Sequence, residues 1–152
     1  MHSSLHVAKK ILNLAENAGD KSITPMKLLK LVYIAHGWML GLCGRRLITE
    51  DVYAWQYGPV IPKLYKDIKR FGRTQVTSTS IDGDSLPEFD GEEESIISQV
   101  YEKYSQYSGP TLSAMTHAKG TPWWEVWHKN KQIGGVIPTD LIRTYYKELS
   151  VV

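Results

Sequence analysis

The chain has 152 residues, of which 42% are apolar and 22% are charged. This length and balance indicate one globular domain that buries its own core, and they exclude disorder over the whole chain. Cys43 is the single cysteine, so the chain forms no internal disulfide and implies no oxidising compartment.

The N-terminus and the longest apolar stretch determine the expected location. The first residues lack the apolar centre of a signal peptide. The apolar stretch Leu28–Leu42 is interrupted by Lys30, His36 and Gly37, and we judge it too short and too mixed to span a bilayer. We therefore expect a cytoplasmic protein that does not contact a membrane.

The charge is unevenly distributed. Residues 1–75 carry twelve Lys or Arg against five Asp or Glu, whereas residues 76–152 carry six against eleven. Such asymmetry is typical of surfaces that bind nucleic acid or steer a protein partner, although a plain solvated surface also produces it. We favour a solvated surface or a protein interface over a nucleic-acid surface.

The first predicted elements are two helices. One begins at Ser3 or Ser4, either of which can cap it, and ends near Glu16. A second is expected over about residues 25–42, with Thr24 as its N-cap and Pro25 in its first turn, where the missing N–H has no partner to lose. This helix is apolar around most of its circumference, which predicts the central, most buried helix of the fold.

A short extended segment or hairpin entry is predicted over residues 47–57. Tyr57-Gly58-Pro59-Val60 favours a tight turn into a helix from about Val60 to Phe71, because Gly permits unusual backbone angles and Pro fixes φ. Residues 73–80 are expected to include a second short extended segment, since Gln75–Thr79 is rich in β-prone residues. Residues 80–91, rich in Ser, Asp, Gly and Pro, predict an exposed loop.

The second half of the chain is expected to be helical. The predicted helices, the first opened by Asp90 or Gly91, are Glu92–Tyr107, Thr111–His117, Trp123–His128 and Thr139–Leu149. The sequence therefore predicts a mainly α fold: a compact single-domain helical bundle over residues 1–152, built around the central helix, with a small β-hairpin or short extended segments near 47–57 and 73–80.

Combinations of His, Cys and Ser that could carry chemistry all have plainer explanations. Cys43 with His36 or His117 lacks a local nucleophile signature. Ser113 and His117 lie four residues apart on a predicted helix, but no orienting acid or oxyanion site accompanies them at a telling spacing. The five histidines have no metal-ligand spacing, and no glycine-rich phosphate motif occurs. We expect no catalytic, cofactor or metal site, and therefore no enzyme.

Two groups of residues are candidate partner contacts. Lys63, Lys66 and Arg70 align on the predicted third helix as a basic ridge that could touch phosphates, although the solvated face of an amphipathic helix is the favoured explanation. The chain is also rich in Trp and Tyr, which often dominate binding energy at interfaces. The aromatic candidates are Tyr57, Trp124 and Trp127. The two tryptophans are included because Trp123, Trp124 and Trp127 cannot all face inward from one helix.

Three blocks of sequence, in a fixed order, form a recognisable pattern. They are Met26–Trp38, Glu50–Pro62 with its Ala-Trp and Tyr-Gly-Pro-Val, and Leu112–His117 followed by Gly120–Trp123. Together the blocks resemble the SocA-like antitoxin domain, also called the Panacea domain and found in phage-associated proteins of the GepA kind. The resemblance covers nearly the whole chain.

The resemblance implies a helical antitoxin of a toxin–antitoxin system. It would neutralise a cognate toxin protein, encoded by a neighbouring gene, through direct contact. A proteolytic adaptor that delivers the toxin to an ATP-dependent protease is the alternative, and a nucleic-acid-binding regulator is a further one. The resemblance brings no catalytic residues, and the signature residues themselves can be scaffold rather than binding surface.

Overall fold

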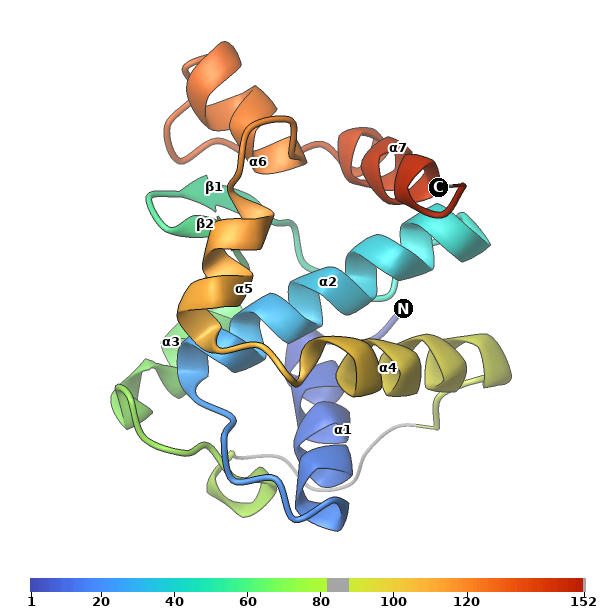
Figure 1. The fold of residues 1–152 in the computed structure, drawn as a ribbon, viewed down its shortest axis with the longest axis vertical. Helices are drawn as coiled ribbons and strands as arrows, with labels where there is room; N and C mark the ends of the chain where they lie inside the picture. The colour runs from blue at the N-terminus through green and yellow to red at the C-terminus, as the bar shows by residue number, and fades with distance from the viewer. Residues whose placement is uncertain (82–87, 152) are drawn as a thin grey trace.

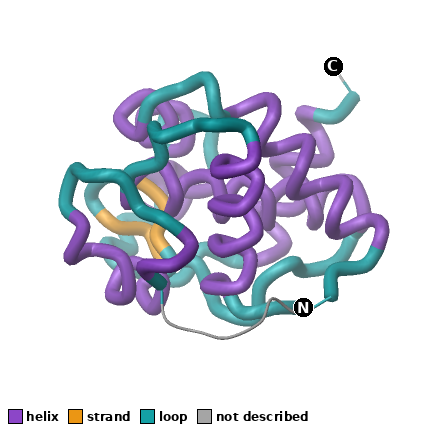
Figure 2. The backbone as a smooth tube through the Cα atoms, turned by 90° about the horizontal axis from the view of Figure 1, so that it is seen from below, coloured by secondary structure: helices purple, strands orange, loops and turns teal. Residues whose placement is uncertain are grey.

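The computed structural model describes residues 1–81 and 88–151, and it confirms the mainly helical prediction (Figure 1). The helices are α1 (Ser4–Asn17), α2 (Pro25–Cys43), α3 (Pro62–Ile68), α4 (Gly91–Tyr104), α5 (Gly109–Thr116), α6 (Pro122–Trp124) and α7 (Thr139–Leu149). Short 3₁₀ turns cover Lys69–Phe71 and Ser78–Ser80, and one π-helical turn covers Glu125–Lys129. The strands are β1 (Tyr53–Trp55) and β2 (Gly58–Val60), which pair as an antiparallel hairpin beside the helices (Figure 2).

Helix α2 is the centre of the fold, as the sequence predicts. The Thr24 side chain accepts a hydrogen bond from the Lys27 backbone N–H, and Pro25 occupies the first turn. Gly44, with φ of 69°, ends the helix in the left-handed conformation that glycine adopts without strain. Helices α1, α4, α5 and α7 pack around α2, which explains why it is apolar on nearly every side (Figure 1).

The helix is longer than the apolar stretch Leu28–Leu42. By length and composition alone, Pro25–Cys43 is long enough and apolar enough to cross a bilayer. Most of its residues are buried among the neighbouring helices, which is the arrangement of a core helix.

Helix α7 lies directly on two glycines of α2. A Cβ atom added at Gly37 would overlap the ring of Tyr146, and one at Gly41 would lie 2.8 Å from the backbone nitrogen of Lys147. Tyr146 is buried and also packs edge-on against Trp38 at a ring-centroid distance of 5.2 Å. The absence of side chains at these glycines therefore allows the close approach of the two helices.

The hairpin is fastened by side chains from three different helices. The carbonyl of Trp55 accepts a hydrogen bond from Trp123 Nε1 at 2.6 Å. The carbonyl of Tyr57 accepts one from Ser113 Oγ, and the carbonyl of Pro59 accepts one from Lys30 Nζ at 2.9 Å. Elements far apart in the sequence thus fix the position of two short strands that would not be stable alone.

The prediction that Gly58-Pro59 forms a tight turn into a helix is wrong. Both residues belong to β2, with Gly58 opposite Trp55 and Pro59 opposite Ala54, and α3 begins only at Pro62. The missing N–H of Pro59 is tolerated because Ala54 bonds on its other side to the backbone of residues 134–135. A third segment far along the chain therefore supports the strand pairing.

Residues 73–80 form no strand, although Thr77 has the extended backbone angles that the sequence favours. Val76 makes a single backbone hydrogen bond to Ile23, and the chain then enters the 3₁₀ turn Ser78–Ser80, closed by a capping box at Thr77. Local side-chain hydrogen bonds of Ser and Thr compete with strand formation here. The predicted exposed loop 80–91 falls partly on residues 82–87, outside the described part, and Ile81 and Phe89 at its two ends are buried.

The C-terminal helices follow the sequence closely. Thr139–Leu149 has the predicted bounds, whereas α4 ends at Tyr104, before the predicted end at Tyr107. The predicted helix over 123–128 is divided into α6 and the π-helical turn Glu125–Lys129. The Thr121 side chain caps α6 by accepting from the Trp124 N–H, as the Thr-Pro pattern favours.

Candidate functional site

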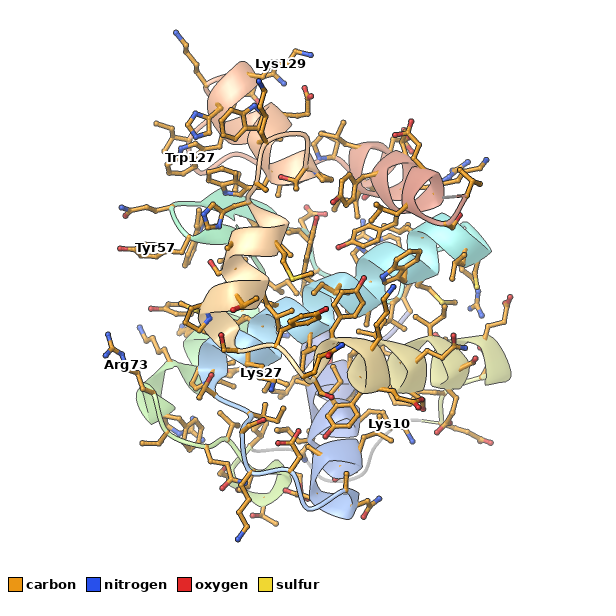
Figure 3. All side chains as sticks on the ribbon, viewed as in Figure 1. Lys10, Lys27, Tyr57, Arg73, Trp127 and Lys129 are labelled. Atoms are coloured by element: carbon orange, nitrogen blue, oxygen red, sulfur yellow. The ribbon has the colours of Figure 1, made fainter. Side chains whose placement is uncertain are left out.

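A groove of about 1100 Å³ lies between the start of α2, the hairpin, the segment after α3 and residues 127–134. We call it the aromatic groove. Its apolar lining consists largely of Met26, Trp55, Tyr57, Tyr65, Trp127 and Ile133. Figure 3 shows Tyr57 and Trp127 along the same side of the molecule, with Arg73 below them.

The groove gathers large apolar side chains that remain exposed. Tyr57 is 64% exposed and Ile133 is 73% exposed, and both Met26 and Tyr65 are also exposed. Trp55 and Tyr65 stack edge to face at a ring-centroid distance of 5.5 Å, which holds the aromatic wall in a fixed shape. A contiguous exposed apolar patch of this kind is typical of a binding surface.

The charges in the groove are all positive. Lys30 lies inside it at 2% exposure, and Lys69 and Arg73 line it from the exposed segment after α3. No Asp or Glu lines the groove among the described residues, and within that part of the chain none of these three cations forms an ion pair. The groove is therefore an apolar surface with a positive charge.

Lys30 is held in place by the backbone of β2. Its ammonium donates to the Pro59 carbonyl at 2.9 Å, the one hydrogen bond it makes to the described residues. Gly58 leaves space for this contact, because a Cβ added there would lie 2.9 Å from Lys30 Nζ. Burial lowers the pKa of Lys30 to about 7. A buried ammonium with one carbonyl partner has spare capacity to donate hydrogen bonds.

Lys27, one turn earlier on α2, shows the contrasting arrangement. Its ammonium donates to the Ser105 carbonyl and to Ser22 Oγ, and Asp20 lies close enough to interact with it electrostatically. Burial lowers the pKa of Lys27, while the charge of Asp20 opposes the shift. Lys27 is thus satisfied within the fold, whereas Lys30 faces a groove without an acidic partner among the described residues.

The structure brings together only part of the predicted contact set. Tyr57 and Trp127 line the groove, and Trp127 stacks on Trp123 at 5.2 Å. Trp124 does not line it and stacks instead on His128 at 3.9 Å. The role of Tyr57, Trp124 and Trp127 as contacts with a partner stays a prediction.

The basic ridge is also divided. Lys63 and Lys66 are exposed on α3 and do not line the groove. Arg70 donates to the carbonyls of Asp67 and Ser80 and lies over the ring of Phe71 at 4.6 Å. Arg70 therefore links the two 3₁₀ turns by hydrogen bonds. The cations of this segment that line the groove are Lys69 and Arg73, which were not part of the predicted ridge.

The nucleophile candidates take part in structural contacts. Ser113 Oγ donates to the Tyr57 carbonyl and lies 3.4 Å from His117 Nδ1, with no described carboxylate bonded to that imidazole. His36 accepts from the backbone N–H of Leu47 at 3.2 Å, and burial lowers its pKa to about 3, so it stays neutral. Burial, followed by the effect of Glu92, raises the pKa of Cys43, which disfavours the reactive thiolate.

Lys30 is the main groove residue that sequence reasoning missed. It interrupts the apolar run of the central helix, and a lysine inside such a run is the available signal. Its proximity to Lys69 and Arg73 depends on the placement of the segment after α3, which local sequence does not encode.

The chain is also similar in sequence to known proteins. The family model described as "Antitoxin SocA-like, Panacea domain" matches residues 28–124. The protein named "Antitoxin SocA" from Caulobacter vibrioides (strain NA1000 / CB15N) is 33% identical over 125 residues, which cover 77% of this chain and 66% of that relative. No solved structure matches the chain. The resemblance noted in the sequence is confirmed: the chain belongs to the SocA-like antitoxin family with a Panacea domain.

Proposed function

We propose that this protein is an antitoxin that acts in the cytoplasm and neutralises a cognate toxin protein by direct binding through the aromatic groove. The observation that carries the proposal is the gathering of exposed Tyr57, Tyr65 and Ile133 in one groove of a chain from an antitoxin family. Covering such a patch with a partner gains hydrophobic free energy, and Tyr and Trp at its centre are effective anchors.

The test is co-expression with the product of the adjacent open reading frame. We expect that product to arrest growth alone, and we expect this chain to restore growth and to co-purify with it. A neighbouring product that is harmless alone, or growth arrest that this chain does not relieve, would refute the antitoxin role. Rescue that disappears in a strain lacking the ATP-dependent protease would replace direct neutralisation with the adaptor route.

A matched pair of variants assigns the binding to the groove. Tyr57→Ala/Ile133→Ala removes two exposed apolar side chains from it, whereas Leu42→Ala/Val151→Ala removes two exposed ones outside it. We expect the first pair to weaken the complex by about 2 kcal/mol and the second to leave it unchanged. Equal effects of the two pairs would place the interface elsewhere.

A further inference from the structure

The positive charge of the groove indicates which chemical group a ligand would carry. Three cations, Lys30, Lys69 and Arg73, line it, and no carboxylate does so among the described residues. Burying an ammonium is costly unless a counter-charge compensates it, and within residues 1–81 and 88–151 Lys30 bonds only to the Pro59 carbonyl. A carboxylate is the group that best completes this environment, because it accepts hydrogen bonds and carries the opposite charge.

The cations differ in exposure, which suggests how they act. Lys30 is buried, so a charge that reaches it is removed from solvent and pairs strongly. Lys69 and Arg73 are exposed, so they attract an acidic partner and contact its outer part. A ligand that fits both must carry its acid next to groups that fill the aromatic wall of Trp55, Tyr65 and Trp127.

The size of the groove favours a segment of polypeptide. Its volume of about 1100 Å³ lies at the upper limit of the usual range for small-molecule sites, and it is large enough to hold several side chains of a polypeptide segment. Tyr57 and Ile133 are exposed, so the groove is open to solvent, and Figure 3 shows Tyr57 at the left of the molecule. A chain segment can reach the apolar wall of the groove from solvent.

We infer that the aromatic groove binds an acidic–apolar segment of the partner protein, with an Asp or Glu side chain of that segment paired to Lys30 and flanking apolar side chains packed on Trp55, Tyr57 and Trp127. This inference rests on the proposed function and names the part of the toxin that is recognised. Lys69 and Arg73 would orient the segment from the exposed side.

The test uses a random peptide display library selected on the purified full-length chain. We expect enriched peptides to contain Asp or Glu next to aromatic or aliphatic residues. A synthetic peptide from this set, measured by the change in the intrinsic tryptophan fluorescence of the chain, should bind roughly thirtyfold more weakly to Lys30→Met. Its Asn or Gln counterpart should bind the unaltered chain with a similar loss and should not respond to Lys30→Met.

Lys63 and Lys66 lie on α3 outside the groove, so they provide a control for the effect of net charge. Lys69→Glu/Arg73→Glu and Lys63→Glu/Lys66→Glu change the net charge equally on the same segment. We expect the first pair to weaken peptide binding by about tenfold at low salt and the second by less than about threefold. Similar losses from both pairs would reduce the effect to general attraction and would overturn the assigned geometry.

The outcomes separate this inference from the proposed function. A library that yields no enriched peptide, or peptides without an acid, refutes the acidic segment. Growth rescue that survives Lys30→Met also refutes it while leaving the antitoxin role intact. Failure of the unaltered chain to rescue growth refutes the antitoxin role whatever the peptides show.

Discussion

The two ends of helix α2 are completed in different ways. Toward its C-terminus, α7 covers the helix, and the ring of Tyr146 occupies the space that side chains at Gly37 would fill. Toward its N-terminus, Lys30 faces a groove whose apolar wall stays exposed. One end is thus covered by the chain itself, whereas the other end keeps an exposed apolar wall.

Under the proposed function, one core helix serves both stability and recognition. The closed end gains from close packing, which is sensitive to a single added carbon. The open end carries a buried cation that costs folding free energy and is retained next to an exposed aromatic wall. Substitutions at each end of α2 therefore separate the contribution of close packing to stability from the contribution of Lys30 to binding.

The largest effect is expected at the closed end. Gly37→Ala places a methyl group inside the Tyr146 ring, so either Tyr146 or the whole of α7 must move. We expect the free energy of unfolding to fall by about 3 kcal/mol, measured by denaturant titration. Gly91→Ala is the control, because a Cβ there meets nothing within 4 Å. A Gly37→Ala protein of unchanged stability would contradict the close α2–α7 contact.

The open end should respond in the opposite direction. Lys30→Met removes a buried ammonium while keeping the apolar stem, so we expect the free energy of unfolding to rise by about 2 kcal/mol at pH 7, after the loss of the hydrogen bond to Pro59. A variant that is more stable yet fails to bind would mark Lys30 as a functional residue. Destabilisation would instead make it structural.

The pH dependence of stability checks the same residue. The folded pKa of Lys30, about 7, lies below the ordinary lysine value of 10.5, so the unfolded chain holds more protons between these values. The contribution of Lys30 to stability therefore rises with pH across that window. The advantage of Lys30→Met should be greatest at or below pH 7 and should decrease toward pH 10. An advantage that does not change with pH would show that Lys30 is not buried as a cation.

A smaller effect is expected on recognition. Because pairing needs the protonated ammonium, affinity for an acidic peptide should fall about tenfold as the pH rises from 7 to 8.5. Among the described residues, the other ionisable groups that line or adjoin this region are Lys69, Arg73, Tyr57, Tyr65 and His117, the last because its Cβ lies near Gly58. His117→Gln should keep the pH dependence, and Lys30→Met should abolish it. Loss of the dependence in His117→Gln would reassign it to the imidazole.

The sequence predicts the closed part of the molecule better than the open part. The position of α2 follows from its apolar circumference, and Thr24-Pro25 sets where it begins. The role of Gly58-Pro59 could not be predicted, because β2 depends on Ala54 bonding to residues 134–135 and on the contact between Lys30 and Pro59. Short strands are decided by distant partners, whereas helices are largely decided by local pattern.

The sequence predicts the aromatic residues of the groove but not its buried lysine. Tyr57 and Trp127 follow from the large number of Trp and Tyr residues in the chain, since such side chains favour interfaces. Lys30 does not follow, because a lysine in an apolar helix normally predicts a charge that reaches the surface along its stem. Only the three-dimensional arrangement shows that its ammonium stays buried beside β2.

The three carbonyls of the hairpin have a consequence for how a bound complex holds together. Trp55, Tyr57 and Pro59 are anchored independently by Trp123, Ser113 and Lys30. A carboxylate that draws Lys30 toward itself competes with one anchor and leaves the other two intact. Under the proposed binding mode, the hairpin would keep the hydrogen bonds from Trp123 and Ser113 while Lys30 pairs with the carboxylate, and these two bonds would hold it in position.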